Sequence, residues 1–554
     1  MEDSIIRERV NSMIAETLSS CFNSVDRVLM TNHIKSLVDD PLWDVSSINT
    51  FHSFNRITSI DNLIARLAKI NEKQTKQKQN GVFYTPNDAA RFLICNAFLN
   101  YICRDINEIY SVNKSISFII SQSIDIISKL LFASVFDPTC GASEFLLVVA
   151  EQKIKILELT NSNIQDSDIL DIARTIFGND LSVVSTVISK IRLFFYLSKY
   201  LNCDSSLSSL VKILNSNFKN LDFVILNNGI KKRYAIIVGN PPYVEYKDLP
   251  YKPNTGFGNA YADVVNNANS VLDSKGVMAF VLPVSFVSTK RMYLIRKKLT
   301  QDFRKLYTLN FADRPDCLFP GVHQKLSLII GCKGKEHCSI LSSKYYHWNQ
   351  NEREQLFENC EVVQNNLAHN DFIPKLGNKI ECDIFEKITN CCATSFKDFI
   401  DCSEETKIYL NMRACFWMKA FSFNPGSSEY KAFPVSPIHK NYLICLLNSN
   451  LFYFFWTVIS DCWHITNKEL VFFKVPLNDI NFDKFNKLAI RLEHRLEKTK
   501  KYIGSKQTAY EYKHKECKSI IDEIDDEIKN IYNLNGSELD YIKAYNLKYR
   551  MSTL

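Results

Sequence analysis

The sequence predicts an α/β fold in which helices cover a central, largely parallel sheet. Between Gly81 and about Lys333, short apolar β-branched runs alternate with longer amphipathic segments, a pattern typical of strands and the helices that cover them. Before this region, residues 1 to about 70 carry apolar side chains at three- and four-residue steps, which indicates helices. After it, the sequence is first irregular and aromatic, and then charged with helical periodicity.

These changes in pattern predict four parts. They are a helical N-terminal segment (1–75), an α/β domain (76–333), an α+β domain (334–480) and a helical C-terminal segment (481–554). A chain of 554 residues is too long for one hydrophobic core, so several domains are expected.

The composition is that of a soluble globular protein, with 46% hydrophobic and 23% charged residues, and it excludes disordered and collagen-like classes. The net charge of +7 permits a polyanionic partner without requiring one. No two of the 17 cysteines have Cys-x-x-Cys spacing, so we expect reduced thiols and no metal site.

No segment of the sequence predicts a membrane span or a secretory signal. Residues Met1 to Val10 are charged, and the most apolar stretch, Leu443 to Ile459, is interrupted by Asn448, Ser449 and Asn450. We interpret that stretch as a buried core segment and expect a cytoplasmic protein without a membrane partner.

The predicted strands of the α/β domain direct attention to the loops that follow them. These strands are Leu131–Phe136, Thr175–Gly178, Tyr234–Gly239, Val277–Leu282 and Leu326–Ile330. In parallel sheets, ligands bind beyond the carboxyl ends of the strands, so functional side chains are expected there.

The loop after the first predicted strand is built of small residues and runs from Asp137 to Phe145, where a helix to Ile156 begins. Asp137, Thr139 and Gly141 are candidate ligand-binding residues, because such a loop lets backbone approach a nucleotide-like group and the helix N-terminus can bind a carboxylate. An ordinary strand–helix turn is the alternative interpretation.

Two further segments fit the same kind of ligand. Asp180 follows the second strand, where a carboxylate can accept hydrogen bonds from ribose hydroxyls, although a helix cap would also explain it. Upstream, Thr85 is a good N-cap and Pro86 a good first residue for a helix from Asn87 to Leu99. A helix start is a sufficient explanation; the functional interpretation places Phe83, Tyr84 and Thr85 against the ligand.

The strand Tyr234–Gly239 leads directly into Asn240-Pro241-Pro242-Tyr243. Two prolines cannot continue a strand ladder, so they hold a rigid loop at the edge of the sheet. The Asn240 side-chain oxygen and the Pro241 carbonyl can accept both N–H bonds of a planar amino group, and Tyr243 can stack on its ring. This chemistry activates an aryl amine as a nucleophile; a strand-terminating turn is the alternative.

The order of these motifs resembles the gamma-ordered DNA adenine-N6 methyltransferases of restriction–modification systems. The corresponding segments are Phe83–Pro86, Asp137–Gly141, Asp180, Asn240–Tyr243 and a target-recognition region after about residue 334. The resemblance implies a Rossmann-like domain that binds S-adenosylmethionine and methylates a flipped adenine in double-stranded DNA. It also implies cofactor contact by Asn240, and it implies a separate restriction endonuclease or other defence-system subunits as partners.

The resemblance further assigns a second base-stacking aromatic residue to Phe319, within Leu318-Phe319-Pro320-Gly321, although a core aromatic is the alternative. Two positions depart from the family. Ser143 stands where a glycine is usual, and Asn217 replaces the acidic residue expected beside an adenine ring. We expect Asn217 still to hydrogen-bond the cofactor, with reduced affinity.

Two other functions remain open from the residues alone. The tetrapeptide also serves amino-methyltransferases that act on RNA or on protein glutamine. The changes at Ser143 and Asn217 would also suit a catalytically weak DNA-binding subunit. No nuclease motif is recognisable in residues 1–80, so we expect no DNA cleavage by this chain.

Overall fold

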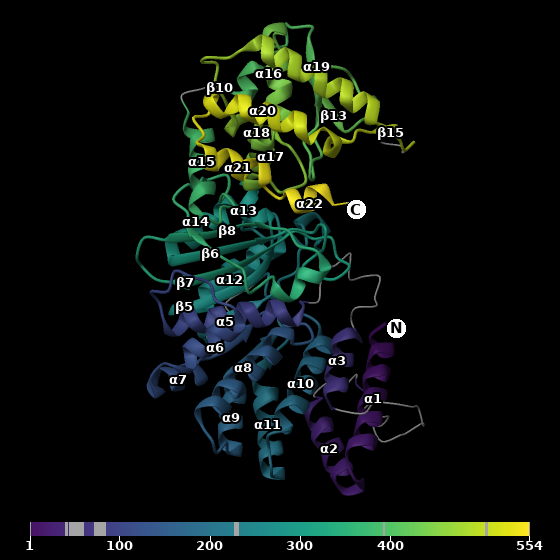
Figure 1. The fold of residues 1–554 in the computed structure, drawn as a ribbon. Helices are drawn as coiled ribbons and strands as arrows, with labels where there is room; N and C mark the ends of the chain where they lie inside the picture. Colours follow the sequence, from purple (N-terminus) through teal and green to yellow (C-terminus); the bar gives the residue numbers. More distant parts are fainter. Residues whose placement is uncertain are drawn as a thin grey trace.

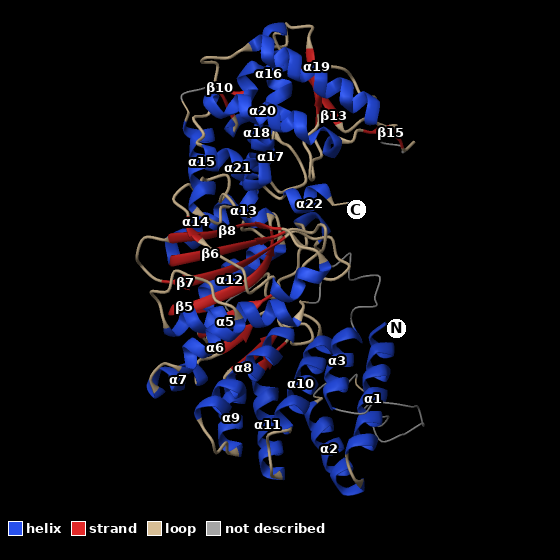
Figure 2. Ribbon diagram, viewed as in Figure 1, coloured by secondary structure: helices blue, strands red, loops and turns tan. Residues whose placement is uncertain are grey.

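A computed structural model describes residues 2–38, 43, 60–70, 85–225, 232–391, 394–504 and 508–552 of the chain. A central sheet lies in the middle of the molecule, with the N-terminal helices at one end and the C-terminal region at the other (Figure 1). Figure 2 shows that strands are concentrated in this central layer and that helices predominate on both sides of it.

The central sheet has nine strands in the order β3-β2-β1-β4-β5-β7-β6-β8-β9. Their bounds are β1 Val135–Asp137, β2 Ile176–Asn179, β3 Phe218–Lys219, β4 Tyr234–Gly239, β5 Leu272–Pro283, β6 Phe303–Phe311, β7 Leu326–Lys333, β8 Ser339–Tyr346 and β9 Val363–Gln364. In this order, the first five strands, β3, β2, β1, β4 and β5, run parallel. Strand β7 is antiparallel to both β5 and β6, and β8 is parallel to β6. The α/β prediction is confirmed; the sheet is largely parallel and becomes mixed through the antiparallel strands β7 and β9.

The predicted strands differ from the observed ones at two places. Leu131 ends helix α7 (Ile124–Leu131), and β1 begins only at Val135, because the apolar run spans the end of the helix and the start of the strand. The sheet also continues past residue 333, where the sequence predicts the α/β domain to end, because β8 pairs with β6 from Lys305 to Phe311.

Helices cover the sheet and connect its strands. They are α5 Asn87–Ile102, α6 Val112–Ile120, α7, α8 Glu144–Thr160, α9 Asp166–Arg174, α10 Val183–Ser198, α11 Asp204–Asn217, α12 Ala260–Val271, α13 Ser285–Ser288 and α14 Tyr293–Asp302. Helices α5 and α10 are buried along most of their length, which explains why they lack a polar face.

The N-terminal segment forms α1 Glu2–Cys21, α2 Ser24–Leu37 and α3 Ile60–Lys69, as predicted for helices. Residues 39–42, 44–59 and 71–75 of this predicted segment lie outside the described residues. Two buried cations of α10 attach this segment. Lys190 Nζ donates to the Leu37 carbonyl at 2.7 Å, and Arg192 Nε donates to the Ile64 carbonyl at 3.0 Å.

The C-terminal region combines helices with short strands. Its elements are η5 Gln350–Gln355, α15 Lys379–Asn390, β10 Thr394–Ser395, β11 Lys407–Asn411, β12 Ala420–Phe421, β13 Tyr430–Pro434, α16 Pro437–Asn448, α17 Asn450–Ile459, α18 Asn467–Phe472, β14 Lys474–Val475, α19 Phe482–Thr499, β15 Lys501–Tyr502, β16 Tyr510–Glu511, α20 Lys518–Ile531, α21 Gly536–Ala544 and α22 Leu547–Met551. Every residue of α17 is buried, which agrees with the core interpretation of Leu443–Ile459.

Within the described ranges, no single helix is long and apolar enough to cross a membrane, and α16 and α17 pass such a test only as a pair bent by 64°. The sixteen cysteines in this part of the chain are free thiols. Among the same residues, no group of three or more His, Cys, Asp and Glu side chains is arranged to hold a metal ion.

Candidate active site

The loops singled out in the sequence meet at the carboxyl edge of strands β1 to β4. Asn179 at the end of β2, which the sequence did not indicate, holds the loops after β1, β2 and β3 together. Its fully buried amide donates to the carbonyls of Pro138 and Leu221 at 2.9 Å each, and its oxygen accepts from the Leu221 backbone N–H at 2.9 Å. The loops after β1, β2 and β3 are therefore fixed as one surface.

Two carboxylates organise the loop after β1. Asp137 Oδ1 accepts from the Thr139 backbone N–H at 3.0 Å, and Asp180 Oδ2 accepts from the Gly141 N–H at 2.9 Å. The other oxygen of Asp180 accepts from the Ser182 N–H at 2.8 Å, so this residue also fulfils the capping role considered from the sequence. Burial raises the pKa of both carboxyls, and that of Asp137 lies well above its ordinary value.

The same loop ends in a strained residue. Ser143, the N-cap of α8, has φ 68° and ψ 37°, a left-handed conformation that costs a residue with a Cβ about 1–2 kcal/mol. Its hydroxyl and that of Thr139 are buried and make no hydrogen bond to any described residue. Buried hydroxyls without partners are uncommon, and two in one loop fit the binding of a polar ligand there.

Strand β4 approaches the loop after β1 closely. A Cβ at Gly239 would lie 2.8 Å from Asp137 Oδ1, so only glycine permits this approach. Asn240 follows directly and is half-buried, and Pro241 is buried. The tetrapeptide thus lies beside the loop after β1, because β1 and β4 pair in parallel.

The side chain of Tyr243 turns toward Asn240. Its hydroxyl donates to Asn240 Oδ1 at 2.5 Å, with the Val281 carbonyl as a second acceptor at 3.1 Å. Its ring stands edge-on to that of Tyr261, with centroids 6.3 Å apart and an interplanar angle of 88°. Burial raises the pKa of Tyr243 well above its ordinary value, so the hydroxyl stays protonated and serves as a donor.

The segment after the tetrapeptide is anchored by two carboxylates that the sequence did not single out. Asp263 on α12 accepts from Tyr246 Oη at 2.6 Å and from the Thr255 hydroxyl, and Asp222, just after β3, accepts from Tyr251 Oη. The position of Asp222 just after the carboxyl end of β3 is the signal that could have indicated it.

Asn217 does not lie in this site. Its amide donates to the carbonyls of Ala173 at 3.2 Å and Ile176 at 2.9 Å, so it caps α9 at the amino end of β2. The site lies at the opposite end of that strand. The predicted contact between Asn217 and the cofactor is therefore wrong, and its role is to close a helix against the sheet.

Two other predicted positions, Phe319 and Thr85, are buried. Phe319 is 1% exposed and forms a β-bridge with Val322, which agrees with the core interpretation. Thr85 is 3% exposed, and the N-cap of α5 is the next residue, Pro86, rather than Thr85. Phe83 and Tyr84 lie outside the described residues.

Five parallel strands continued by an antiparallel one, with the candidate site at their carboxyl edge, define a Rossmann-like fold. Residues 174–316, from the end of α9 to beyond β6, match the family model described as Eco57I restriction-modification methylase. This part of the chain is thus similar to restriction–modification methylases.

Two known proteins are similar to larger parts of the chain. The type II methyltransferase M.VspI of Vibrio sp. (strain 343) is 22% identical over 282 residues, which are 49% of this chain and 53% of that protein. The matched part of the chain thus spans about half the length of this curated relative. The structure of the type IIL restriction-modification enzyme MmeI in complex with DNA has a TM-score of 0.55 at 13% identity and covers 99% of this chain and 95% of that one, which shows the fold.

Proposed function

We propose that this chain is an S-adenosylmethionine-dependent methyltransferase that methylates the exocyclic N6 amino group of adenine in double-stranded DNA. The observation that carries the proposal is the position of Asn240-Pro241-Pro242-Tyr243. The tetrapeptide directly follows β4 and lies against the loop after β1, where Gly239 meets Asp137. The match of residues 174–316 to the restriction-modification methylase model includes this tetrapeptide and supports methyl transfer as the reaction.

The residues at the carboxyl edge fit the cofactor. The unpartnered hydroxyls of Thr139 and Ser143 and the N–H groups at the start of α8 suit the methionine part of the cofactor. Asp180 retains lone pairs for the ribose hydroxyls, and Asp222 offers a carboxylate to an amino group at the end of β3. When bound, the cofactor supplies a methyl group on a sulfonium centre, which an amine can attack directly.

The chain activates and aligns the amine. Asn240 Oδ1 and the Pro241 carbonyl accept its two N–H bonds, which keeps the nitrogen lone pair out of the aromatic ring and directs it at the methyl group. The Tyr243 ring lies beside the base. Because the proton leaves only after transfer begins, no side chain has to act as a strong base beforehand.

The substrate would be DNA with the target adenine turned out of the helix. Extrusion costs a few kcal/mol, and contacts between the base and aromatic or polar groups of the site offset part of this cost. The description of the matched family model and the name of the MmeI structure place such enzymes in restriction–modification systems. A separate endonuclease or defence-system subunit would then be the partner of this chain.

The test is transfer of labelled methyl groups to unmethylated genomic DNA by wild-type protein and by Asn240→Ala, with Asn351→Ala as a matched control at an exposed position. We expect Asn240→Ala to lose at least about 100-fold in kcat, as removal of an aligned catalytic hydrogen-bonding group does, and Asn351→Ala to be unchanged. Nucleoside mass spectrometry should find N6-methyladenine. Near wild-type transfer by Asn240→Ala would refute the mechanism, and methylated RNA or glutamine as the only product would refute the substrate.

A further inference from the structure

A short turn in the C-terminal region, residues 460–464, is held in an unusual conformation. Asp461 Oδ1 accepts from the backbone N–H groups of both Trp463 and His464 at 2.8 Å, and Ser460 Oγ accepts from the Cys462 N–H at 2.9 Å. Cys462 has φ 56°, a left-handed conformation that is strained for cysteine. Strain of this kind persists where the surrounding contacts impose it, and it is often found at functional sites.

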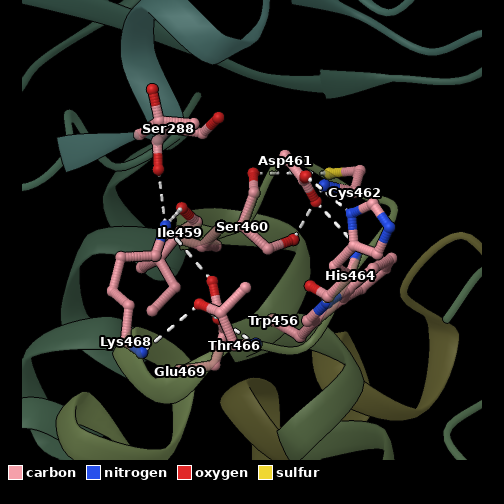
Figure 3. Close-up of polar contacts among 12 residues, drawn as sticks. Ser288, Trp456, Ile459, Ser460, Asp461, Cys462, His464, Thr466, Lys468 and Glu469 are labelled. Carbon is pink, nitrogen blue, oxygen red and sulfur yellow. Dashed lines mark hydrogen bonds and ion pairs between the residues drawn. The ribbon is translucent and has the colours of Figure 1, made fainter. Parts of the chain in front are cut away.

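Two lysines fix this turn to the rest of the molecule. Lys375, fully buried, donates to the carbonyls of Val458 at 3.0 Å and Ser460 at 2.6 Å. Lys468 donates at 2.6 Å to the Ile459 carbonyl and at 2.6 Å to that of Ser288, the last residue of α13. Figure 3 shows Lys468 reaching both carbonyls and the side chains of Asp461 and His464 in contact on the turn. The turn is therefore tied to the segment that follows β5.

The turn carries Trp463, a partly exposed aromatic residue. Trp463 is 38% exposed, and Lys325 Nζ lies 4.2 Å from the centroid of its ring. The Lys325 carbonyl accepts from the Val284 N–H at 2.9 Å, directly after the carboxyl end of β5. The next residue, Ser285, lies 3.0 Å from the hydroxyl of Tyr261.

Tyr261 in turn contacts the Tyr243 ring. A short series of direct contacts therefore connects Trp463 with the catalytic tetrapeptide.

Trp463 also lines a groove between the sheet edge and the C-terminal region. The groove has a volume of about 430 Å³, and its lining includes seven Lys or Arg residues against three acidic ones. Arg314, Lys419 and Lys515 belong to this lining and form no ion pair with any described residue. An exposed indole among uncompensated cations is the combination that binds nucleic acid, because phosphates pair with the cations and bases stack on the ring.

We propose that Trp463 inserts its indole into the DNA base stack beside the extruded adenine and keeps the opened duplex from closing. This role rests on the proposed function and makes Trp463 a positioning residue, because it acts on the duplex and not on the reacting atoms. Insertion of a flat apolar side chain compensates for base stacking lost on extrusion. The rigid turn and its two lysines keep the ring oriented, so little ordering is needed when DNA binds.

The test compares methyl transfer to two short duplexes that carry the sequence methylated in host DNA, as mapped by single-molecule sequencing. One has the target adenine paired, and the other has it mispaired, which lowers the cost of extrusion. Trp463→Ala should slow transfer to the paired duplex by roughly 10-fold or more, since stacking contributes about 1–3 kcal/mol per base. On the mispaired duplex, the transfer rate of Trp463→Ala should return to within about 3-fold of the wild-type rate.

Trp463→Phe keeps a stacking ring and should remain close to wild type on both duplexes. Phe132→Ala is the matched control, an exposed aromatic residue directly after α7 that does not line the groove, and should have no effect. DNA should quench the emission of wild-type protein more than that of Trp463→Phe, which reports contact with the indole even if Trp463→Ala folds poorly.

Equal rates for Trp463→Ala and wild type on the paired duplex would overturn the inference. So would an equal loss on both duplexes, which would indicate a role in folding or general binding. Absence of transfer by wild-type protein would instead refute the proposed function itself.

Discussion

The hydroxyl of Tyr243 donates a hydrogen bond to Asn240 Oδ1 at 2.5 Å, so the side-chain acceptor proposed to hold the substrate amine is engaged within the tetrapeptide. The Val281 carbonyl lies 3.1 Å from the same hydroxyl. A hydroxyl has one proton and donates it to one acceptor at a time, so rotation toward Val281 would release the Asn240 oxygen. The substrate amine therefore competes with Tyr243 for Asn240.

Tyr243→Phe should consequently raise kcat/KM for DNA. The phenyl ring keeps its place against Tyr261, and the competing donor is lost. A hydrogen bond of this kind contributes about 0.5–1.5 kcal/mol, which corresponds to a gain of roughly 2- to 10-fold. Steady-state methyl-transfer assays at varied DNA concentration measure this change in kcat/KM.

Tyr261→Phe is the control for Tyr243→Phe, because it loses the contact with Ser285 and leaves the Tyr243–Asn240 bond intact. It should not raise the rate. A fall in kcat/KM for Tyr243→Phe would show that the hydroxyl assists the substrate instead of competing with it.

Ser143→Gly should stabilise the protein. Glycine adopts φ 68° without strain, and the change also removes a buried hydroxyl without a partner. The free energy of unfolding without cofactor should rise by about 1–2 kcal/mol, as measured by chemical denaturation. Ser143→Ala, which removes the hydroxyl and keeps the strain, should gain less. An equal gain for both variants would show that the conformation is not strained.

The secondary-structure elements that carry the candidate site and follow from local sequence were predicted well. Strand β4 has the predicted bounds, because a continuous apolar run followed by two prolines permits only one end point. The loop at Asp137 was placed correctly for a similar reason, although the preceding strand was predicted several residues too long. In that case a helix and a strand share one apolar run, and local periodicity does not separate them.

The failures concern positions that are set by pairing between distant segments. Strand β3 has only two residues, and its register comes from the pairing of Phe218 with Gly178. That pairing puts Asn217 at one end of the strand and Asp222 beyond the other, which the local sequence does not reveal. The inclusion of β8 in the central sheet likewise depends on its pairing with β6.

Asp222→Ala should therefore weaken cofactor binding, whereas Asn217→Ala should not. Loss of a carboxylate that accepts a hydrogen bond from the ligand should lower the affinity for S-adenosylmethionine by roughly 10-fold, as measured by calorimetry. Tyr251→Phe is the control, because it removes the hydrogen bond that anchors the loop to Asp222 and leaves the Asp222 carboxylate in place. An equal loss in Tyr251→Phe would indicate that Asp222 acts only through the loop.

Asp525 on α20 should make the stability of the C-terminal region depend on pH. It is buried and accepts from the Asn450 amide at 2.5 Å and from the backbone N–H groups of Asn450 and Leu451 at 3.3 Å. Burial raises its pKa from 3.8 to about 7. Because the folded form binds the proton more tightly than the unfolded form, the stabilisation is complete below pH 3.8 and is lost as the pH rises through about 7.

The free energy of unfolding should therefore fall between about pH 4 and pH 8, by up to about 4 kcal/mol, since each pKa unit corresponds to about 1.4 kcal/mol. Asp525→Asn, which cannot ionise, should flatten this dependence in denaturation curves recorded across that range. Asp526→Asn alters an exposed neighbour that pairs with Lys543 and should leave the dependence unchanged. If Asp525→Asn retained the full slope, the titrating group would have to be another buried residue, because the exposed carboxylates gain too little on folding to produce it.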